Sequence, residues 1–379
     1  MKKHYMFTPG PTMVPAEVML AEAAPLIHHR TPQFSAVIRE VTEWLKEMFG
    51  TREDVYIIAG SGTAAMEAAV VNTCSPGDKA ICVAGGKFGE RWGELCSAYG
   101  CDTKVIALKA GESFTVKQAA AALDETPQAR ILCITHSETS TGALTDVEGI
   151  AALTRERDTL LVVDSITGLG VHPLKMDEWG VDVLVSGSQK GLMIAPGLAF
   201  IAVSGRTWKA VDKAACPRYY LDLKAMKKDL QKDTTPFTPA ISLIRALHCS
   251  LSLIRQEGLQ NVHARHARLA EAARAAMKAI GLKLVPECPV NGVTAVWAPT
   301  GVDTDKMTKK MRDEWGVTMA GGQDELKGKV FRIGHMGYVS EEDMLVAVAT
   351  VERALREFGY KFEQGAGLAA ANKVLFGGA

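Results

Sequence analysis

Two residues that could carry chemistry stand where apolar stretches of the sequence end. Asp164 closes the run Leu160–Asp164, and Lys190 follows the run 181–185 by way of Ser186-Gly187-Ser188-Gln189. In parallel sheets the ligand lies beyond the carboxyl ends of the strands, so we expect both side chains to face one site. Apolar residues follow the lysine. Burial lowers the pKa of an amine and makes it a competent nucleophile toward an aldehyde.

Each of these two residues also has an ordinary interpretation. An aspartate after a strand often caps a turn, and an arbitrary loop lysine is usually a surface residue. Neither would define a site by itself. The pairing of Asp164 with a lysine that precedes apolar Leu192, Met193 and Ile194 favours a shared ligand site.

A glycine-rich turn supplies a third feature. Gly60-Ser61-Gly62-Thr63 joins the apolar run 55–59 to an alanine-rich helix expected over 64–71. Free backbone N–H groups at a helix N-terminus, together with the helix dipole, suit a phosphate, and the two hydroxyls add donors. By itself such a turn also serves as a plain connector. The sequence has neither a nucleotide phosphate loop ending in Gly-Lys nor a dinucleotide-binding fingerprint.

An anion cradle, an acid and a lysine together suit pyridoxal phosphate (PLP), which has a phosphate, a ring nitrogen and an aldehyde. The acid keeps the ring nitrogen protonated, so that the ring accepts electrons, and the lysine holds and later exchanges the aldehyde. We therefore expect an enzyme that carries PLP as a Schiff base on Lys190, with Asp164 at the ring nitrogen.

The elements that must position these residues alternate between strands and helices, which predicts an α/β fold with a mostly parallel sheet covered on both faces. The expected strands are 55–59, 80–83, 104–108, 131–135, 160–164, 181–186 and 198–203. The expected helices are 33–49, 64–71, 89–99, 116–124 and 147–157, then 241–257, 261–280, 303–315 and 341–358.

The last hundred residues have a different pattern, in which the expected strands 292–297 and 330–333 alternate with charged helices. This pattern predicts a second, smaller α+β domain. We expect an N-terminal segment over 1–20 near the active site, a large PLP-binding domain over 21–257, a small C-terminal domain over 258–363, and an Ala/Gly-rich tail over 364–379. The helix 341–358 is well marked, because Ser340 is a good N-cap and Asp343 would close a capping box.

Several motifs, in order, resemble the class V aminotransferase family of fold-type I PLP enzymes, close to the alanine–glyoxylate and serine–pyruvate aminotransferases. The resemblance spans nearly the whole chain. Its motifs are Thr8-Pro9-Gly10-Pro11-Thr12, Gly60-Ser61-Gly62-Thr63, Thr135-His136-Ser137-Glu138-Thr139-Ser140-Thr141-Gly142, Asp164-Ser165, Ser186-Gly187-Ser188-Gln189-Lys190, Thr238-Pro239-Ala240-Ile241-Ser242 and Phe331-Arg332-Ile333-Gly334.

The resemblance implies a role for each matching position. It makes Lys190 the Schiff-base lysine and proton carrier, and it pairs Asp164 with the pyridine nitrogen. It places at or near the cofactor phosphate Ser61, Gly62, Thr63 and Gln189, with Thr139 close to the ring oxygen or phosphate. It stacks Phe88 on the ring, where many relatives have Trp. It makes substrate-binding residues of Arg332, Pro9 and Gly10. The guanidinium group of the arginine can form two parallel hydrogen bonds to an α-carboxylate.

The resemblance also implies a homodimer, because a loop of the partner subunit completes the phosphate site in this family. Thr238 matches the threonine of that loop, whereas Thr235 stands where relatives often carry Tyr. The expected reaction transfers the amino group of alanine or serine to glyoxylate or pyruvate by a ping-pong mechanism. The alternatives are another class V activity (ureidoglycine–glyoxylate, aminoethylphosphonate–pyruvate or phosphoserine transaminase, desulfurase or lyase) or a non-catalytic accessory subunit.

Composition limits the partners further. Lys plus Arg (43) equals Asp plus Glu (43) over 379 residues, which argues against nucleic acid or an anionic membrane as the main partner. The eight cysteines are scattered without a C-x-x-C pair, and no secretory leader is recognisable. We therefore expect a cytoplasmic protein with free thiols and no metal site.

Overall fold

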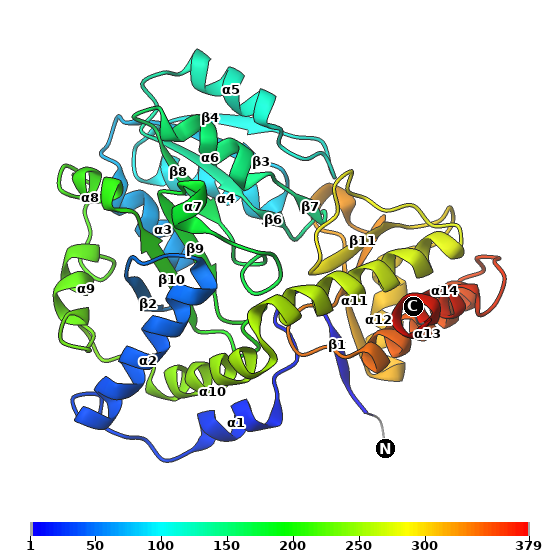
Figure 1. Cartoon of the computed structure of the whole chain (residues 1–379). Coiled ribbons are helices and arrows are strands. Elements are labelled where there is room, and N and C mark those ends of the chain that lie inside the picture. Colours follow the sequence, from blue (N-terminus) through cyan, green and yellow to red (C-terminus); the bar gives the residue numbers. More distant parts are fainter. Residues whose placement is uncertain (1–2, 378–379) are drawn as a thin grey trace.

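The computed structural model describes residues 3–377, which form two large sheets and a two-stranded hairpin, with helices packed around the large sheets (Figure 1). The larger sheet has the strand order β2-β10-β9-β8-β5-β3-β4. Its strands are β2 (Val55–Ala59), β3 (Lys79–Ala84), β4 (Asp102–Ala107), β5 (Ile131–Thr135), β8 (Leu160–Asp164), β9 (Val183–Gly187) and β10 (Leu198–Val203). Neighbours from β9 to β4 are parallel, and β10 is antiparallel to β9 and β2. The predicted α/β fold is confirmed.

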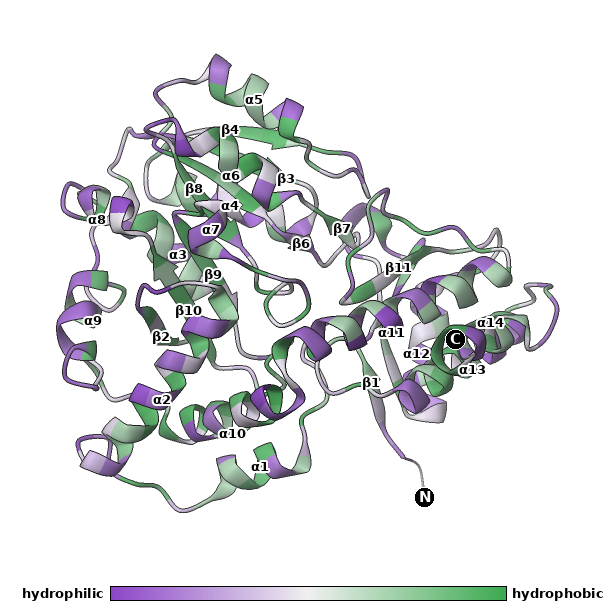
Figure 2. Ribbon diagram, viewed as in Figure 1, coloured by the Kyte–Doolittle hydropathy of each residue, from purple (hydrophilic) through white to green (hydrophobic). Residues whose placement is uncertain are grey.

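Both faces of this sheet are buried, which explains why its strands are apolar without alternation. In β8, Leu161 and Val163 pack into one core cluster, whereas Leu160 and Val162 pack into the other. The first cluster includes residues of α2 (Pro32–Phe49), α5 (Val116–Glu125), α6 (Val147–Arg155) and α10 (Ile241–Glu257); the second includes α3 (Gly62–Thr73) and α4 (Lys87–Ala98). Figure 2 shows the strands of the sheet as mostly hydrophobic.

The smaller sheet has the order β1-β12-β13-β11 and joins the first strand of the chain to three strands from its last hundred residues. Its strands are β1 (Tyr5–Phe7), β11 (Val293–Trp297), β12 (Val317–Gly321) and β13 (Val330–Gly334). Its helices are α11 (Leu259–Ala279), α12 (Thr304–Trp315) and α13 (Glu341–Glu357). Strand β1 pairs in parallel with β12, so the first strand of the chain belongs to the smaller sheet rather than to the larger one that follows it.

Most of the elements that the sequence pattern did not predict are short, because a few residues carry too little periodicity. These short elements are β1, β12, α1 (Ala16–Ala23), β6 (Ser137–Glu138), β7 (Ala143–Leu144), α7 (Met176–Trp179), α8 (Gly205–Val211), α9 (Leu223–Leu230) and a 3-10 turn at Asp324–Leu326. The hairpin of β6 and β7 matters most, since it carries part of the segment 135–142 toward the candidate site.

The predicted start of α13 is confirmed. The Ser340 hydroxyl accepts a hydrogen bond from Asp343 N at 3.1 Å, and the Asp343 carboxylate accepts from Ser340 N at 3.1 Å. These reciprocal bonds satisfy two N–H groups that a helix N-terminus leaves unpaired.

The segment expected as an Ala/Gly-rich tail contains a helix, α14 (Ala366–Phe376), and only residues 378–379 of it lie outside the described chain. Helix α14 packs on α11 and α13. The buried Glu352 of α13 accepts hydrogen bonds from Gly365 N at 2.9 Å and Leu368 N at 3.0 Å. A carboxylate thus caps the positive end of α14 and docks it.

None of the helices within residues 3–377 combines the length and apolarity that crossing a lipid bilayer requires.

The docking of α14 gives a first prediction. Glu352→Ala leaves two N–H groups of α14 without their carboxylate, so we expect a loss of about 2 kcal/mol in the free energy of unfolding and faster amide exchange across 365–376. Hydrogen exchange read by mass spectrometry measures both the site and the size of the effect. Glu342→Ala, on the exposed side of the same helix, is the matched control. Unchanged exchange in α14 would contradict this role.

Candidate active site

A cavity lies at the carboxyl ends of β8 and β9, where the sequence placed its acid and its lysine. It collects residues from the turn before α3, the start of α4, the segment after β5 and the loops after β8 and β9. Its lining is formed by Ser61, Gly62, Thr63, Phe88, Arg91, Ser137, Thr139, Asp164, Ile166, Thr167, Gln189 and Lys190. Every residue predicted to bind the cofactor is therefore in one cavity, except Thr238.

Lys190 is held by the N-terminal segment. Its Nζ donates a hydrogen bond to the Pro9 carbonyl at 2.7 Å, and the side chain is buried. Burial lowers the pKa of the amine to about 8, an effect that Asp164 opposes and that Arg332 and Arg91 reinforce. Gly10 has a φ of 137°, and a Cβ there would lie 2.2 Å from Nζ, so the chain can pass the amine only with glycine at this position.

Asp164 is the matching acid. It is buried at the end of β8, and one of its carboxylate oxygens accepts a hydrogen bond from Ile166 N at 2.8 Å. Burial raises the pKa of this carboxyl to about 7, whereas the Ile166 N–H and the charge of Lys190 lower it. A cationic ring N–H beside the carboxylate would favour its ionised form, as PLP requires.

The turn before α3 has the donors that a phosphate needs. Ser61 is the N-cap of α3, yet its side chain makes no capping bond, so the helix N-terminus is left to the cavity. Two buried polar atoms on the cavity wall, Gln189 Oε1 and Ser137 Oγ, find no hydrogen-bond partner within residues 3–377. Unpaired buried polar atoms on a cavity wall indicate a missing polar ligand. The residues present therefore fit PLP.

Phe88 stands over the lysine. It is the second residue of α4, and Lys190 Nζ lies 5.8 Å from the centroid of its ring. The buried carboxylate of Glu138 holds the start of this helix, because it accepts hydrogen bonds from Gly89 N at 2.9 Å and from Ser140 N at 3.0 Å. The aromatic ring is thus fixed by the segment that follows β5.

Arg332 reaches the site from the other sheet. It lies on β13, where its Nη1 donates to the Thr139 carbonyl at 3.0 Å and its Nε to the Gly321 carbonyl at 2.9 Å. Burial lowers the pKa of this guanidinium to about 10, an effect that Glu138 opposes, and the side chain remains cationic at neutral pH. Arg332 does not line the cavity itself but touches its wall through Thr139.

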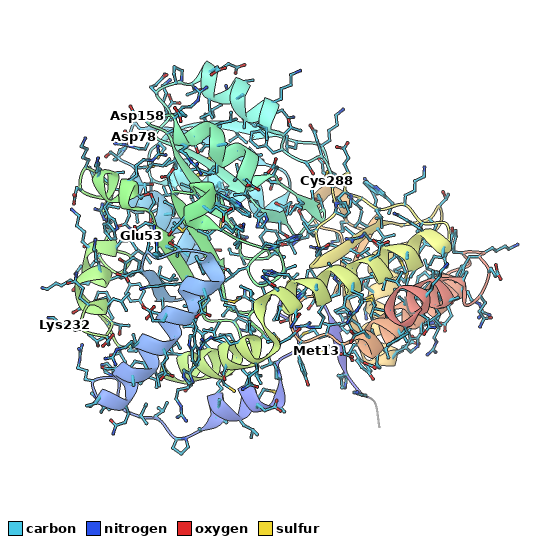
Figure 3. The ribbon with its side chains drawn as sticks, viewed as in Figure 1. Met13, Glu53, Asp78, Asp158, Lys232 and Cys288 are labelled. Atoms are coloured by element: carbon cyan, nitrogen blue, oxygen red, sulfur yellow. The ribbon has the colours of Figure 1, made fainter. Side chains whose placement is uncertain are left out.

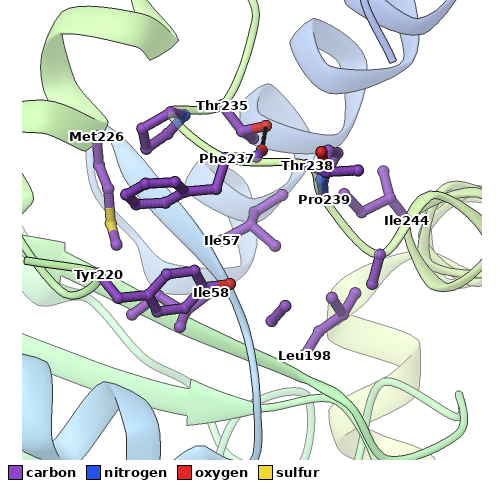
Figure 4. Close-up of a pocket in the computed structure, with 13 residues that line it drawn as sticks. Ile57, Ile58, Leu198, Tyr220, Met226, Thr235, Phe237, Thr238, Pro239 and Ile244 are labelled. Atoms are coloured by element: carbon purple, nitrogen blue, oxygen red, sulfur yellow. Dashed lines mark hydrogen bonds between the residues drawn. The ribbon is translucent and has the colours of Figure 1, made fainter. Parts of the chain in front are cut away.

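Thr238 lies in a different groove of the same chain. Figure 4 shows it with Phe237, Tyr220 and Thr235, whose hydroxyl donates to the Phe237 carbonyl at 2.7 Å. It is absent from the lining of the cavity that holds Lys190. Within one chain the structure therefore leaves this predicted residue apart from the rest.

Four cavity residues were not predicted: Arg91, Ser137, Ile166 and Thr167. Arg91 follows Phe88 by three positions on one helix, which places both side chains on the same face, and this spacing was the signal available. Thr167 is found only through its hydroxyl contact with Thr139 at 2.6 Å, which sequence spacing does not reveal.

Three buried cysteines gather outside the cavity. The sulfur atoms of Cys82, Cys96 and Cys133 lie within 4.8 Å of one another in the apolar core between α4, β3 and β5. Burial raises the pKa of the Cys133 thiol well above its usual value. Neutral thiols of this kind behave as small core residues.

Comparison with known proteins places this cavity in context. Residues 4–344 match the family model described as aminotransferase class-V. The chain is 44% identical to the small subunit of a soluble hydrogenase from Synechococcus sp. (strain PCC 6716), over 98% of both chains. It is 36% identical to an L-aspartate–glyoxylate aminotransferase from Paracoccus denitrificans (97% of this chain, 95% of the relative).

A solved structure agrees with these sequence relatives. The fold superposes on an alanine–glyoxylate aminotransferase from Nostoc sp. with a TM-score of 0.90 at 34% identity, over 94% of this chain and 96% of the other. The likeness therefore extends over nearly the whole chain.

The buried amine gives a prediction that needs no substrate. In the full-length protein freed of PLP, reductive methylation of Lys190 by formaldehyde should reach half its maximal rate near pH 8, because only the neutral amine reacts. Peptide mass spectrometry measures the pH profile, and exposed Lys232 (Figure 3) shows that the reagent is active at each pH. A midpoint at about 10.4, the value of an unperturbed lysine, would contradict the effect of burial.

Proposed function

The chain belongs to the class V aminotransferase family, whose members depend on PLP, and from this premise we propose that it transfers the amino group of alanine or serine to glyoxylate or pyruvate. The observation that carries the proposal is the meeting of Lys190, Asp164 and the Ser61–Thr63 turn in one cavity beside Arg332. Amine, acid, anion cradle and carboxylate clamp are the groups that amino-acid transamination needs.

Bound PLP supplies an aldehyde that condenses with amines and a protonated ring that accepts electrons from the carbon being deprotonated. On this proposal the turn Ser61–Thr63 and Gln189 hold its phosphate, Thr139 lies near them, Phe88 covers the ring, and Asp164 keeps the ring nitrogen protonated. The Ser61 hydroxyl, which makes no capping bond at the start of α3, supports the assignment of the phosphate end, and the burial of Asp164 supports that of the ring end.

Lys190 then acts as the base of the reaction. Its Nζ takes the proton from Cα of the amino acid and holds it until it is returned. A pKa of about 8 suits this task, because the amine can both accept and release a proton near neutral pH. The Pro9 carbonyl, 2.7 Å from Nζ, offers the free amine a fixed acceptor, so the amine stays oriented when it is not covalently engaged.

Arg332 binds the α-carboxylate of the substrate on this proposal. Its Nε and Nη1 are bonded to backbone carbonyls, and within residues 3–377 Nη2 has no partner. A guanidinium group already fixed by two hydrogen bonds loses little conformational entropy when it binds a carboxylate. Pro9 and Gly10 border the amine, which leaves little room for a substrate side chain and favours a small donor.

The relatives share an acceptor rather than a donor. Glyoxylate is named for both the Paracoccus and the Nostoc enzymes, whereas their donors are L-aspartate and alanine. The hydrogenase name belongs to the Synechococcus protein. We do not propose a hydrogenase role for this chain, because its cavity brings together a reactive amine and groups that can bind a phosphate and a carboxylate. The same groups argue against an accessory subunit without turnover.

A half-reaction screen tests the proposed donor. The PLP-loaded protein, mixed with alanine or serine and no acceptor, should lose the visible absorption band of lysine-bound PLP, and glyoxylate should restore it. Arg332→Ala should raise KM for the donor by about 100-fold, because a charge-assisted bidentate contact is lost, while PLP stays bound.

Aspartate, phosphoserine and aminoethylphosphonate belong in the same panel, since each stands for a different class V activity. Arg332→Lys keeps the positive charge but not the planar guanidinium group. Its KM for the donor should therefore lie between those of wild type and Arg332→Ala. If no amino donor changes the spectrum, the proposed activity is wrong. If Arg332→Ala leaves KM unchanged, Arg332 is not the carboxylate site.

We further propose a homodimer in which Thr238 serves the phosphate site of the partner subunit. Two observations support it. Thr238 lies outside the cavity of its own chain, and its groove is apolar and flanked by the half-exposed Tyr220. The eight free cysteines similarly support the proposal of a reducing, cytoplasmic setting.

Mixed dimers distinguish a contribution across the interface from one within a chain. We expect Thr238→Val to weaken PLP binding and Lys190→Ala to abolish turnover. A mixed dimer contains one Thr238→Val chain and one Lys190→Ala chain. If Thr238 acts across the interface, one of its two sites combines the native Lys190 of the first chain with the native Thr238 of the second. Such dimers should therefore regain the PLP affinity and turnover of a wild-type site. Mixed dimers that bind PLP as weakly as the Thr238→Val homodimer would place Thr238 in the site of its own chain.

A further inference from the structure

Arg91 is a positively charged residue that lines the cavity. It lies on α4, one turn after Phe88, and its guanidinium carbon is 5.3 Å from the centroid of that ring. Its Nη1 donates a hydrogen bond to Thr63 Oγ1 at 3.1 Å. Among residues 3–377, no carboxylate forms an ion pair with it.

An arginine in such a place needs an anion. A half-buried guanidinium with only a neutral hydroxyl and an aromatic face as neighbours has lost part of its hydration without gaining a charged partner. Apart from Lys190, it is the cation among the cavity-lining residues. Asp164 lines the same cavity, and the charge of Arg91 lowers its pKa, but among residues 3–377 the two groups form no ion pair. On the proposed function this carboxylate pairs with the ring nitrogen, so an anion bonded directly to Arg91 would come from a ligand.

The position of Arg91 indicates which ligand anion this is. Thr63 is the second residue of α3, so the guanidinium stands beside the first backbone N–H groups of that helix, where a phosphate would bind. Arg332, the clamp proposed for the substrate carboxylate, comes instead from β13 and contacts Thr139. One guanidinium group thus reaches the site from the helix α4 and the other from the strand β13 of the smaller sheet.

We propose that Arg91 is a phosphate-binding residue of the cofactor site, in which its guanidinium supplies the positive charge that the neutral Ser61–Thr63 turn lacks. The proposal rests on the PLP dependence of the proposed function and adds a residue to it. Thr63 Oγ1 orients the guanidinium by accepting from Nη1, so that the remaining donors face the cradle. Phosphate near pH 7 carries close to two negative charges, and a helix N-terminus offsets only about half a charge.

The test compares two ligands that differ only in the phosphate. PLP and pyridoxal share the ring and the aldehyde that reacts with Lys190, but pyridoxal has no phosphate. The full-length protein is freed of PLP by dialysis, and Kd for each ligand is measured from the visible absorption band. Arg91→Gln should raise Kd for PLP by about 10- to 100-fold, the range for one charge-assisted hydrogen bond. Kd for pyridoxal should not change.

Two further variants sharpen the comparison. Arg91→Lys keeps the charge and should recover part of the PLP affinity, and inorganic phosphate should compete with PLP less well in Arg91→Gln than in wild type. Arg52→Gln removes an almost fully exposed arginine outside the cavity and should leave both Kd values unchanged. Unchanged binding of pyridoxal to Arg91→Gln shows at the same time that the variant is folded.

The possible outcomes separate the two proposals. If wild type binds PLP and pyridoxal equally, the phosphate cradle and with it the proposed cofactor site are wrong. If wild type prefers PLP and Arg91→Gln keeps that preference, only the role of Arg91 is overturned. A weaker binding of both ligands, or a raised KM for aspartate with normal PLP affinity, would also overturn it; the second result would assign Arg91 to a substrate carboxylate.

Discussion

The site depends on the burial of an amine and a carboxyl group at adjacent strand ends. Burial acts on the two groups in opposite directions, lowering the pKa of Lys190 to about 8 and raising that of Asp164 to about 7. Each charge partly offsets the shift of the other, and both groups are left able to change protonation near neutral pH. The parallel pairing of β8 with β9 creates this situation, because it brings two chain segments out at the same edge of a sheet.

The N-terminal segment joins that edge to the second sheet. Strand β1 belongs to the smaller sheet, and only a few residues later the Pro9 carbonyl meets Lys190 Nζ. Thr12 Oγ1 continues the contact by donating to the Lys190 carbonyl at 3.1 Å. The lysine is therefore held by a segment that is anchored in the other half of the molecule, which couples the packing of the two sheets to the position of the reactive amine.

The positively charged side chains of the site come from different secondary-structure elements. Arg332 arrives from β13 and Arg91 from α4, while the buried Glu138 sits between the start of α4 and the segment that carries Thr139. This arrangement allows an anionic cofactor and an anionic substrate to be bound by separate cations. The segment after β5 serves both parts of the site. Its Glu138 holds the start of the helix that carries Phe88, and its Thr139 carbonyl accepts a hydrogen bond from Arg332.

The sequence by itself predicted the large sheet and indicated that Lys190, Asp164 and the turn at 60–63 would meet in one cavity, because an uninterrupted apolar strand buried on both faces is a local signal and its carboxyl end marks the ligand side. It did not determine α14, whose place depends on the buried Glu352, or the roles of Ser137 and Arg91 in the cavity wall. Those features rest on contacts between residues far apart in the chain. Only the tertiary structure decided that β1 joins the smaller sheet and delivers Pro9 to Lys190, since strand pairing over hundreds of residues leaves no periodic trace in sequence.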